Sequence, residues 1–263
     1  MISSTVNYSY RNMGLRKFYQ TEWHGISFKS IPNLSTSTLP SDHFYEKFYS
    51  EFSKIYSSLS ELDPKWIELK LFAANWLIKQ LEVHYGERTL SIGVGLGILE
   101  NHIRKKLDID LHVHEVSDTV KQYFDDSFPD DHIHIGNYPD CIAGDLKFDT
   151  IIMGGIEYIF DEDALENLIS KIYDQLNPGG RLLLISWSFY EQSTLSKAKY
   201  WVKECLVKFK LYRKDGQFWG FLRTKEELQH TIEKVGFELL SSQKDRSVGE
   251  WNTLFLSFIK KVD

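Results

Sequence analysis

A glycine-rich turn after a short apolar run is the part of this sequence best suited to chemistry. The run 89–94 leads into Gly93, Gly95 and Gly97, and a helical pattern begins near Ile98. Glycines let the backbone of such a turn approach a ligand closely, and open α/β sheets bind ligands at the carboxyl ends of their strands. Glu115 ends the next apolar run, where a carboxylate can accept both hydroxyls of a ribose. The pattern predicts a site for a nucleoside-containing cofactor.

The spacing of the glycines helps to distinguish between classes of nucleoside-containing cofactor. A dinucleotide fingerprint reads GxGxxG, whereas this sequence reads GxGxG and has Ile98 where the last glycine of that fingerprint would stand. The turn also comes late, because the strand before it begins only at Thr89. An NAD(P)-dependent oxidoreductase is therefore the less favoured alternative.

The elements around the turn alternate between short apolar runs and helical patterns, which is typical of a parallel sheet with crossover helices. The apolar runs are 89–94, 111–115, 132–135, 148–153, 181–187, 237–242 and 251–258. The helical patterns are 99–106, 118–123, 162–176 and 224–235. Because Asn177, Pro178, Gly179 and Gly180 end a helix well, we expect a turn there before the fifth strand. The fold class is predicted to be α/β.

Two segments lie outside this alternation. Residues 1–62 are rich in aromatic residues and contain a helix that starts at Ser41, while a second helix starts at Asp63 with Pro64. Residues 188–223 form an insertion that is predicted to be a helix followed by a hairpin around Asp215 and Gly216. We therefore expect an N-terminal lid lobe over 1–62, a nucleoside-binding domain over 63–263 and a cap insertion at 188–223.

These motifs follow one another as they do in the class I S-adenosylmethionine-dependent methyltransferases, which the sequence resembles from about Pro64 to Asp263. The resemblance rests on the glycine turn, Glu115, the run 148–158 and the turn 177–180. It implies a three-layer α/β/α fold with a seven-stranded, mostly parallel sheet whose last strand is antiparallel. It implies S-adenosyl-L-methionine as the cofactor and S-adenosyl-L-homocysteine as the product. By the same resemblance, the Gly93–Gly97 turn packs on the methionine part, Glu115 holds the ribose and Asn137 lies near the adenine amine.

Two residues depart from the usual pattern of the family. Ser91 stands two positions before the first glycine, where an acidic residue is common, so the methionine amino group needs another partner. Backbone carbonyls near Gly93 and Gly154 are candidates for that partner. Asn137 stands where the family often has an aspartate, and it keeps a hydrogen-bond acceptor without the charge.

The candidate catalytic residues follow the fourth run. Glu157 and Tyr158 stand where many family members have a Glu-His pair, so the usual histidine base is absent there. His24 of the N-terminal lobe is a candidate base, although a structurally bonded histidine is the simpler interpretation. Candidate substrate-binding residues are aromatic side chains of the segments 1–76 and 187–221, which are expected to build the lid, namely Trp23, Trp187, Tyr190, Phe218 and Trp219.

Composition and charge disfavour several kinds of partner. The chain has 31 Lys and Arg against 37 Asp and Glu, a net charge of -6, so no global basic field is available for nucleic acid. No apolar run approaches the roughly 18 residues that span a bilayer, and no apolar leader begins the chain. The two cysteines form no disulfide framework, which fits a cytoplasmic protein. The basic positions from Lys197 to Lys214 are expected to be a solvated face, or else to attract an anionic acceptor.

Two histidine pairs suggest a metal, but we predict none. His112 and His114 alternate on one run, and His132 and His134 alternate on the next. Their faces can differ, and the sequence shows no carboxylate or cysteine cluster beside them.

The sequence therefore predicts a methyltransferase that acts on an oxygen, less readily a nitrogen, of a small polar molecule such as a sugar derivative or secondary metabolite. A non-catalytic module that keeps the fold and binds a partner is the third alternative. The oligomeric state stays open.

Overall fold

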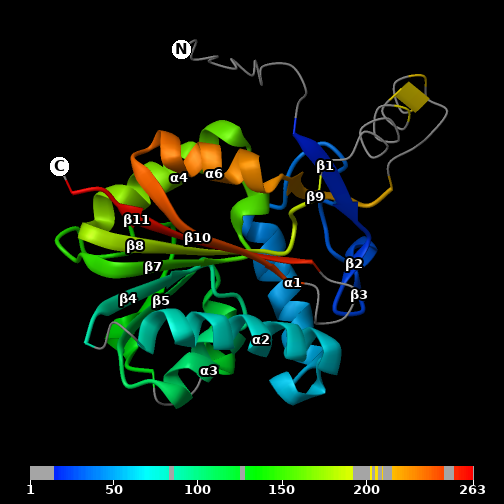
Figure 1. The fold of residues 1–263 in the computed structure, drawn as a ribbon. Coiled ribbons are helices and arrows are strands. Elements are labelled where there is room, and N and C mark those ends of the chain that lie inside the picture. The colour runs from blue at the N-terminus through cyan, green and yellow to red at the C-terminus, as the bar shows by residue number, and fades with distance from the viewer. Residues whose placement is uncertain are drawn as a thin grey trace, which may run out of the picture.

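A seven-stranded sheet forms the centre of the computed structural model, in the order β10-β11-β8-β7-β4-β5-β6 (Figure 1). The described residues are 15–82, 86–124, 128–191, 215–245 and 252–262, with the single positions 202, 205, 206 and 209. The strands of this sheet are β4 (Arg88–Ile92), β5 (Asp110–Glu115), β6 (Ile133–Ile135), β7 (Phe148–Gly154), β8 (Leu176–Ser186), β10 (Phe237–Asp245) and β11 (Thr253–Lys260). β4, β5, β6, β7 and β8 pair in parallel, whereas β11 is antiparallel to both β8 and β10. The predicted sheet with an antiparallel last strand is confirmed.

Helices cover both faces of the sheet (Figure 1). α2 (Pro64–Leu81) and α3 (Ile98–Lys106) pack on one face, and α4 (Glu162–Gln175) and α6 (Lys225–Lys234) on the other. Neighbouring strand residues face opposite layers, as Ile151 and Ile152 of β7 do. The helices begin where the sequence predicts: Asp63 caps α2, and Thr224 forms a capping box at α6. The three-layer α/β/α prediction is confirmed, and none of the described helices has the length and apolar character to cross a membrane.

The N-terminal lobe shares the core of one face of the sheet. α1 (Asp42–Ile55) begins at Ser41, whose hydroxyl accepts from the Phe44 N–H, and its buried face carries Phe48 and Phe52. These rings belong to the same hydrophobic cluster as Leu77 of α2 and sheet residues such as Leu183. A short hairpin, β2 (Glu22–Trp23) with β3 (Ile26–Ser27), precedes them. The lobe is therefore packed onto the sheet with no separate core of its own.

The described strand of the insertion pairs with the N-terminal lobe. β9 (Gln217–Leu222) pairs antiparallel with β1 (Arg16–Gln20) in a two-stranded sheet beside the main one (Figure 1). Gly216 permits a close approach to the end of β1, because a Cβ there would lie 2.3 Å from the Gln20 carbonyl oxygen. The predicted first strand of that hairpin and most of the cap helix lie outside the described residues, as do the basic positions from Lys197 to Lys214.

The fifth strand starts earlier than predicted. β8 begins at Leu176, and its register with β7 shifts between Phe148 and Thr150. The Asn177 side chain donates to an oxygen of Asp149 at 2.6 Å, which holds the irregular stretch against β7. The expected turn at 177–180 is thus a bulged strand entry.

Candidate active site

A cavity of about 580 Å³ opens where the carboxyl ends of β4, β5, β7 and β8 meet. α1 contributes Tyr45 and Tyr49 to its wall, and α2 contributes Trp66 and Lys70. The volume lies within the roughly 300–1,000 Å³ range of small-molecule sites. The cavity is therefore bounded by the strand ends on one side and the N-terminal lobe on the other.

The glycine turn combines ligand access with close packing. All three glycines have positive φ, and Gly93 and Gly95 line the cavity. A Cβ on Gly97 would lie 2.4 Å from the Phe124 ring, so this glycine packs behind the turn. Gly93 is also constrained, because a Cβ there would lie 2.6 Å from the Ile156 side chain. Only Gly93 and Gly95 of the predicted trio border the cavity.

Glu115 ends β5 at the wall of the cavity, as predicted for a ribose-binding carboxylate. Its two oxygens accept the N–H groups of Gly95 at 2.7 Å and Val116 at 2.8 Å. Burial raises the pKa of the carboxyl, and these N–H donors act in the opposite direction. The Ser117 N–H also hydrogen-bonds the carboxylate, and since a carboxylate has about four acceptor sites, one remains for a further donor such as a hydroxyl. Asn137 and Gly154 also line the cavity.

Ser91 is buried below the turn and does not face the cavity in the described structure. Its hydroxyl donates to Oε1 of Glu100 at 2.6 Å, and both residues are almost fully buried. Glu100 Oε2 has no hydrogen-bond partner among the described residues, and burial raises the pKa of Glu100 to about 6. Glu100 thus places a buried carboxyl group next to Ser91. Sequence reasoning missed it, although Glu100 shares the buried side of α3 with Leu99 and Ile103.

Lys70 lies at the cavity wall, within electrostatic reach of two buried carboxyl groups. Its ammonium nitrogen lies 3.7 Å from the centroid of the Trp187 ring. Burial lowers the pKa of Lys70 to about 8, while the nearby charges of Glu100 and Glu157 oppose that shift. Lys70 was not predictable from the sequence, because a lysine on a helix is usually solvated.

Glu157 and Tyr158 lie at different depths. Glu157 is 1% exposed and lies behind the wall, where its Oε1 accepts the Ser188 hydroxyl at 2.7 Å and burial raises the pKa of the carboxyl. Tyr158 lines the cavity, and its phenol is hydrogen-bonded to Tyr45 and Trp219. Burial raises the pKa of Tyr158 well above its ordinary value, so the phenol is protonated at neutral pH.

His24, the predicted base, is not among the residues that border the cavity. Its ring packs against those of Trp23, Phe52 and Trp66, with a centroid distance of 4.5 Å to Trp66. Burial lowers its pKa to about 4, and Lys70 adds to the shift. His24 is therefore a neutral ring within the aromatic packing.

The predicted acceptor wall divides into two groups. Trp23, Trp187 and Trp219 line the cavity. Phe218 does not, because neighbouring residues on a strand point to opposite sides, and it packs instead on Tyr19 and Phe221. Tyr190 also lies elsewhere, with the Arg16 guanidinium 4.1 Å from its ring centroid.

Two tyrosines of α1 that the sequence did not single out belong to the cavity wall. Tyr45 and Tyr49 lie one helical turn apart on the stripe that faces the core. A Cβ on Gly95 would lie 3.4 Å from the Tyr49 hydroxyl, so this phenol lies directly over the glycine turn.

Comparisons with known proteins identify the fold. No protein-family model and no curated sequence matches the chain. Among solved structures, magnesium protoporphyrin IX methyltransferase (ChlM) from Synechocystis PCC 6803 with bound SAM is 11% identical, with a TM-score of 0.56 over 86% of this chain and 100% of that one. A putative sarcosine dimethylglycine methyltransferase from Galdieria sulphuraria is 13% identical, with a TM-score of 0.54 over 84% and 98%. The [4+2]-cyclase SpnF is 13% identical, with a TM-score of 0.55 over 73% and 80%.

These similarities show that the chain has the fold of the S-adenosylmethionine-dependent methyltransferases. A cyclase shares the same fold, so the reaction has to be argued from the site.

Proposed function

We propose that this chain, which has the class I methyltransferase fold, binds S-adenosylmethionine and methylates a small polar molecule. An oxygen of a sugar derivative or secondary metabolite is the preferred acceptor, and a nitrogen is the second choice. The observation that carries the proposal is a single cavity bounded by Gly93, Gly95 and Glu115 on one side and by aromatic side chains of the lobe on the other.

The residues present fit the cofactor. The positive φ angles of Gly93 and Gly95 expose the backbone of the turn to the cavity, as close approach of a ligand requires. Glu115 would hold the ribose and Asn137 would lie near the adenine. The buried pair of Ser91 and Glu100 would supply negative charge for the methionine ammonium group. When bound, S-adenosylmethionine supplies a methyl group activated by a sulfonium.

The part of the cavity beside the N-terminal lobe is suited to positioning an acceptor molecule and to excluding water from it. Trp23, Trp187 and Trp219 provide flat apolar walls, while Tyr45 and Tyr158 offer hydroxyls that can orient an acceptor. Holding the acceptor oxygen in line with the methyl group is the main contribution such a site makes. An alcohol acceptor must also lose a proton. Lys70, whose pKa is about 8, is partly neutral near pH 8, and its neutral amine can accept that proton.

Calorimetric titration with S-adenosylhomocysteine and with NAD tests the cofactor half. We expect S-adenosylhomocysteine to bind in the micromolar range and NAD not to bind. Glu115→Ala should weaken S-adenosylhomocysteine binding at least about tenfold, since hydrogen bonds to a charged group contribute roughly 1.5–3 kcal/mol. Glu238→Ala, which changes an exposed carboxylate on β10, is the matched control. Unchanged affinity in Glu115→Ala would show that the ribose assignment is wrong.

Transfer of labelled methyl groups from S-adenosylmethionine to a panel of sugars, phenols and amines tests the reaction. Label on a hydroxyl-bearing acceptor supports O-methylation, and label only on amines selects the second choice. Cofactor binding with no transfer to any acceptor favours the non-catalytic module. Binding of NAD in place of S-adenosylhomocysteine favours the oxidoreductase.

A further inference from the structure

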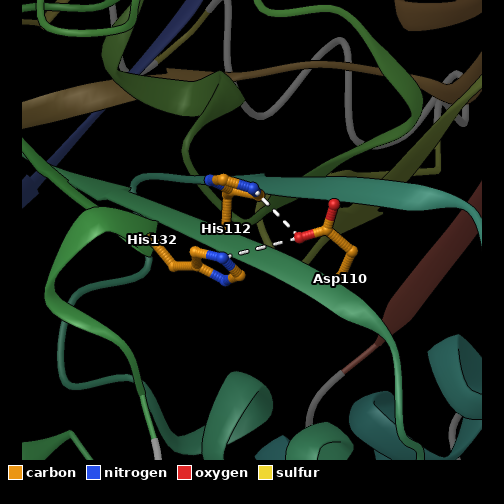
Figure 2. Close-up of side chains that lie close together, drawn as sticks. All are labelled: Asp110, His112 and His132. Atoms are coloured by element: carbon orange, nitrogen blue, oxygen red, sulfur yellow. Dashed lines mark ion pairs between the residues drawn. The ribbon is translucent and has the colours of Figure 1, made fainter.

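Three polar side chains converge on one point at the edge of the sheet, away from the cavity. Asp110 starts β5, His112 lies two residues along it, and His132 ends the 3-10 turn Asp130–His132 that leads into β6. Nε2 of His112 and Nε2 of His132 lie 3.1 Å and 3.7 Å from the same oxygen, Oδ1 of Asp110 (Figure 2). One carboxylate oxygen and two imidazole nitrogens thus lie within 4.8 Å of one another.

This arrangement corrects the reasoning from the histidine pairs. The sequence suggested that the two runs could turn their histidines to different faces and that no carboxylate stood beside them. In the structure, His112 and His132 stack with 4.1 Å between their ring centroids. Asp110, the first residue of β5, supplies the carboxylate. The carboxylate was missed because the predicted run began at Leu111, whereas the strand begins at Asp110, two residues before His112.

Outer contacts fix the orientation of all three groups. Nδ1 of His132 lies 3.2 Å from the Leu111 carbonyl oxygen, so it carries the proton and leaves Nε2 with a lone pair when the ring is neutral. Nδ1 of His112 lies 3.0 Å from Nε2 of His134, a contact that can hold a proton in the same way. Arg88 donates to the other oxygen of Asp110 at 2.8 Å. Such outer partners characterise metal sites, where they fix the tautomer of each histidine and the orientation of each carboxylate.

The spacing suits a small divalent ion. Ligand atoms about 2.0–2.2 Å from a tetrahedral zinc lie roughly 3.3–3.5 Å apart, and the two observed separations of 3.1 and 3.7 Å lie on either side of this range. The two rings are stacked at an interplanar angle of 17°, and a metal ion prefers the plane of each imidazole, so at least one ring has to turn out of the stack when the ion binds. The side chain of Asp110 is 34% exposed and that of His132 is 22% exposed, so an ion has a path from solvent and room for a water ligand.

We propose that Asp110, His112 and His132 form a binding site for a divalent transition-metal ion, with zinc as the first choice. Two imidazoles and one carboxylate form a donor set that zinc accepts. The site lies at the start of β5, whereas Glu115 lies at its end beside the cavity. Its role is therefore structural: a metal ion there joins the segment before the short edge strand β6 to β5.

Calorimetric titration of zinc into the untagged, EDTA-treated full chain tests the proposal. We expect one zinc ion per chain and a higher melting temperature with zinc. His132→Ala should weaken zinc binding by roughly 100-fold or more and abolish the rise in melting temperature. His230→Ala, which removes an exposed histidine of α6, should leave both unchanged.

A second variant and a second metal distinguish loss of the metal site from a folding defect. Asp110→Asn keeps the size of the side chain and should also lose zinc binding, with circular dichroism confirming that the variant is folded. Cobalt bound to the unchanged chain should give the visible absorption of a four- or five-coordinate nitrogen and oxygen site, and zinc should displace it. Absence of stoichiometric zinc binding in the unchanged chain, or equal binding by folded His132→Ala and Asp110→Asn, would overturn the proposal.

Discussion

Replacing Glu100 by glutamine should stabilise the protein at high pH and not at low pH. Burial raises the pKa of Glu100 from its ordinary value of 4.5 to about 6, and the side chain is 2% exposed. A raised carboxyl pKa means that the folded state binds the proton more tightly than the unfolded state. The stabilising contribution is present below pH 4.5 and is lost as pH rises through about 6. A shift of about 1.5 units corresponds to about 2 kcal/mol in the free energy of unfolding.

Urea denaturation of both proteins between about pH 4 and about pH 8 measures this effect. The quantity to follow is the difference in unfolding free energy between Glu100→Gln and the unchanged chain, because other titrating groups cancel in it. This difference should rise by about 2 kcal/mol in favour of the variant across that interval. A difference that stays constant with pH would refute the reasoning, because it would mean that Glu100 titrates alike in both states.

Three further substitutions test the site and the lobe. Gly97→Ala should lower the free energy of unfolding, measured in urea, by about 3 kcal/mol, because φ is 66° and a Cβ would lie 2.4 Å from the Phe124 ring. The control Gly144→Ala, which has open space around its Cβ, should change the same free energy by less than about 0.5 kcal/mol. Equal effects of the two substitutions would contradict the packing argument. Gln217→Ala should cost about 2 kcal/mol by removing bonds that join the insertion strand to the lobe, and an unchanged denaturation midpoint would contradict this. Tyr158→Phe should lower kcat for methyl transfer about tenfold while S-adenosylhomocysteine affinity changes less than about twofold, and an unchanged kcat would remove Tyr158 from the acceptor site.

Most of the central fold was predictable because local chemistry and global fold agree there. Asp63 with Pro64 and the box at Thr224 start helices α2 and α6 where the sequence places them. The apolar runs became the strands of the main sheet, since a buried parallel strand has to be apolar on both faces. The pairing of β9 was not predictable from local signals, because its partner β1 lies about 200 residues earlier and Asp215-Gly216 favours a hairpin on its own.

The cofactor half of the site was predictable and the acceptor half was only partly so. Glycines and a strand-end carboxylate occupy positions fixed by the strand and turn themselves, and Glu115 reached the cavity wall as expected. Acceptor residues come from elements whose placement depends on tertiary packing. The sequence therefore missed Tyr49 and Lys70 and assigned His24 to a site that it does not border. Glu100 was missed because a carboxylate on a helix is usually solvated.

The pairing of β1 with β9 constrains the order in which the molecule can assemble. Residues this far apart in the chain can pair only after the intervening sheet has brought them together, since closing so long a loop is entropically unfavourable. The sheet and its glycine turn can therefore form first, with the ribbon of β1 and β9 added afterwards. Since Phe18 of β1 and Trp219 of β9 both line the cavity, the pocket is completed only in that last step.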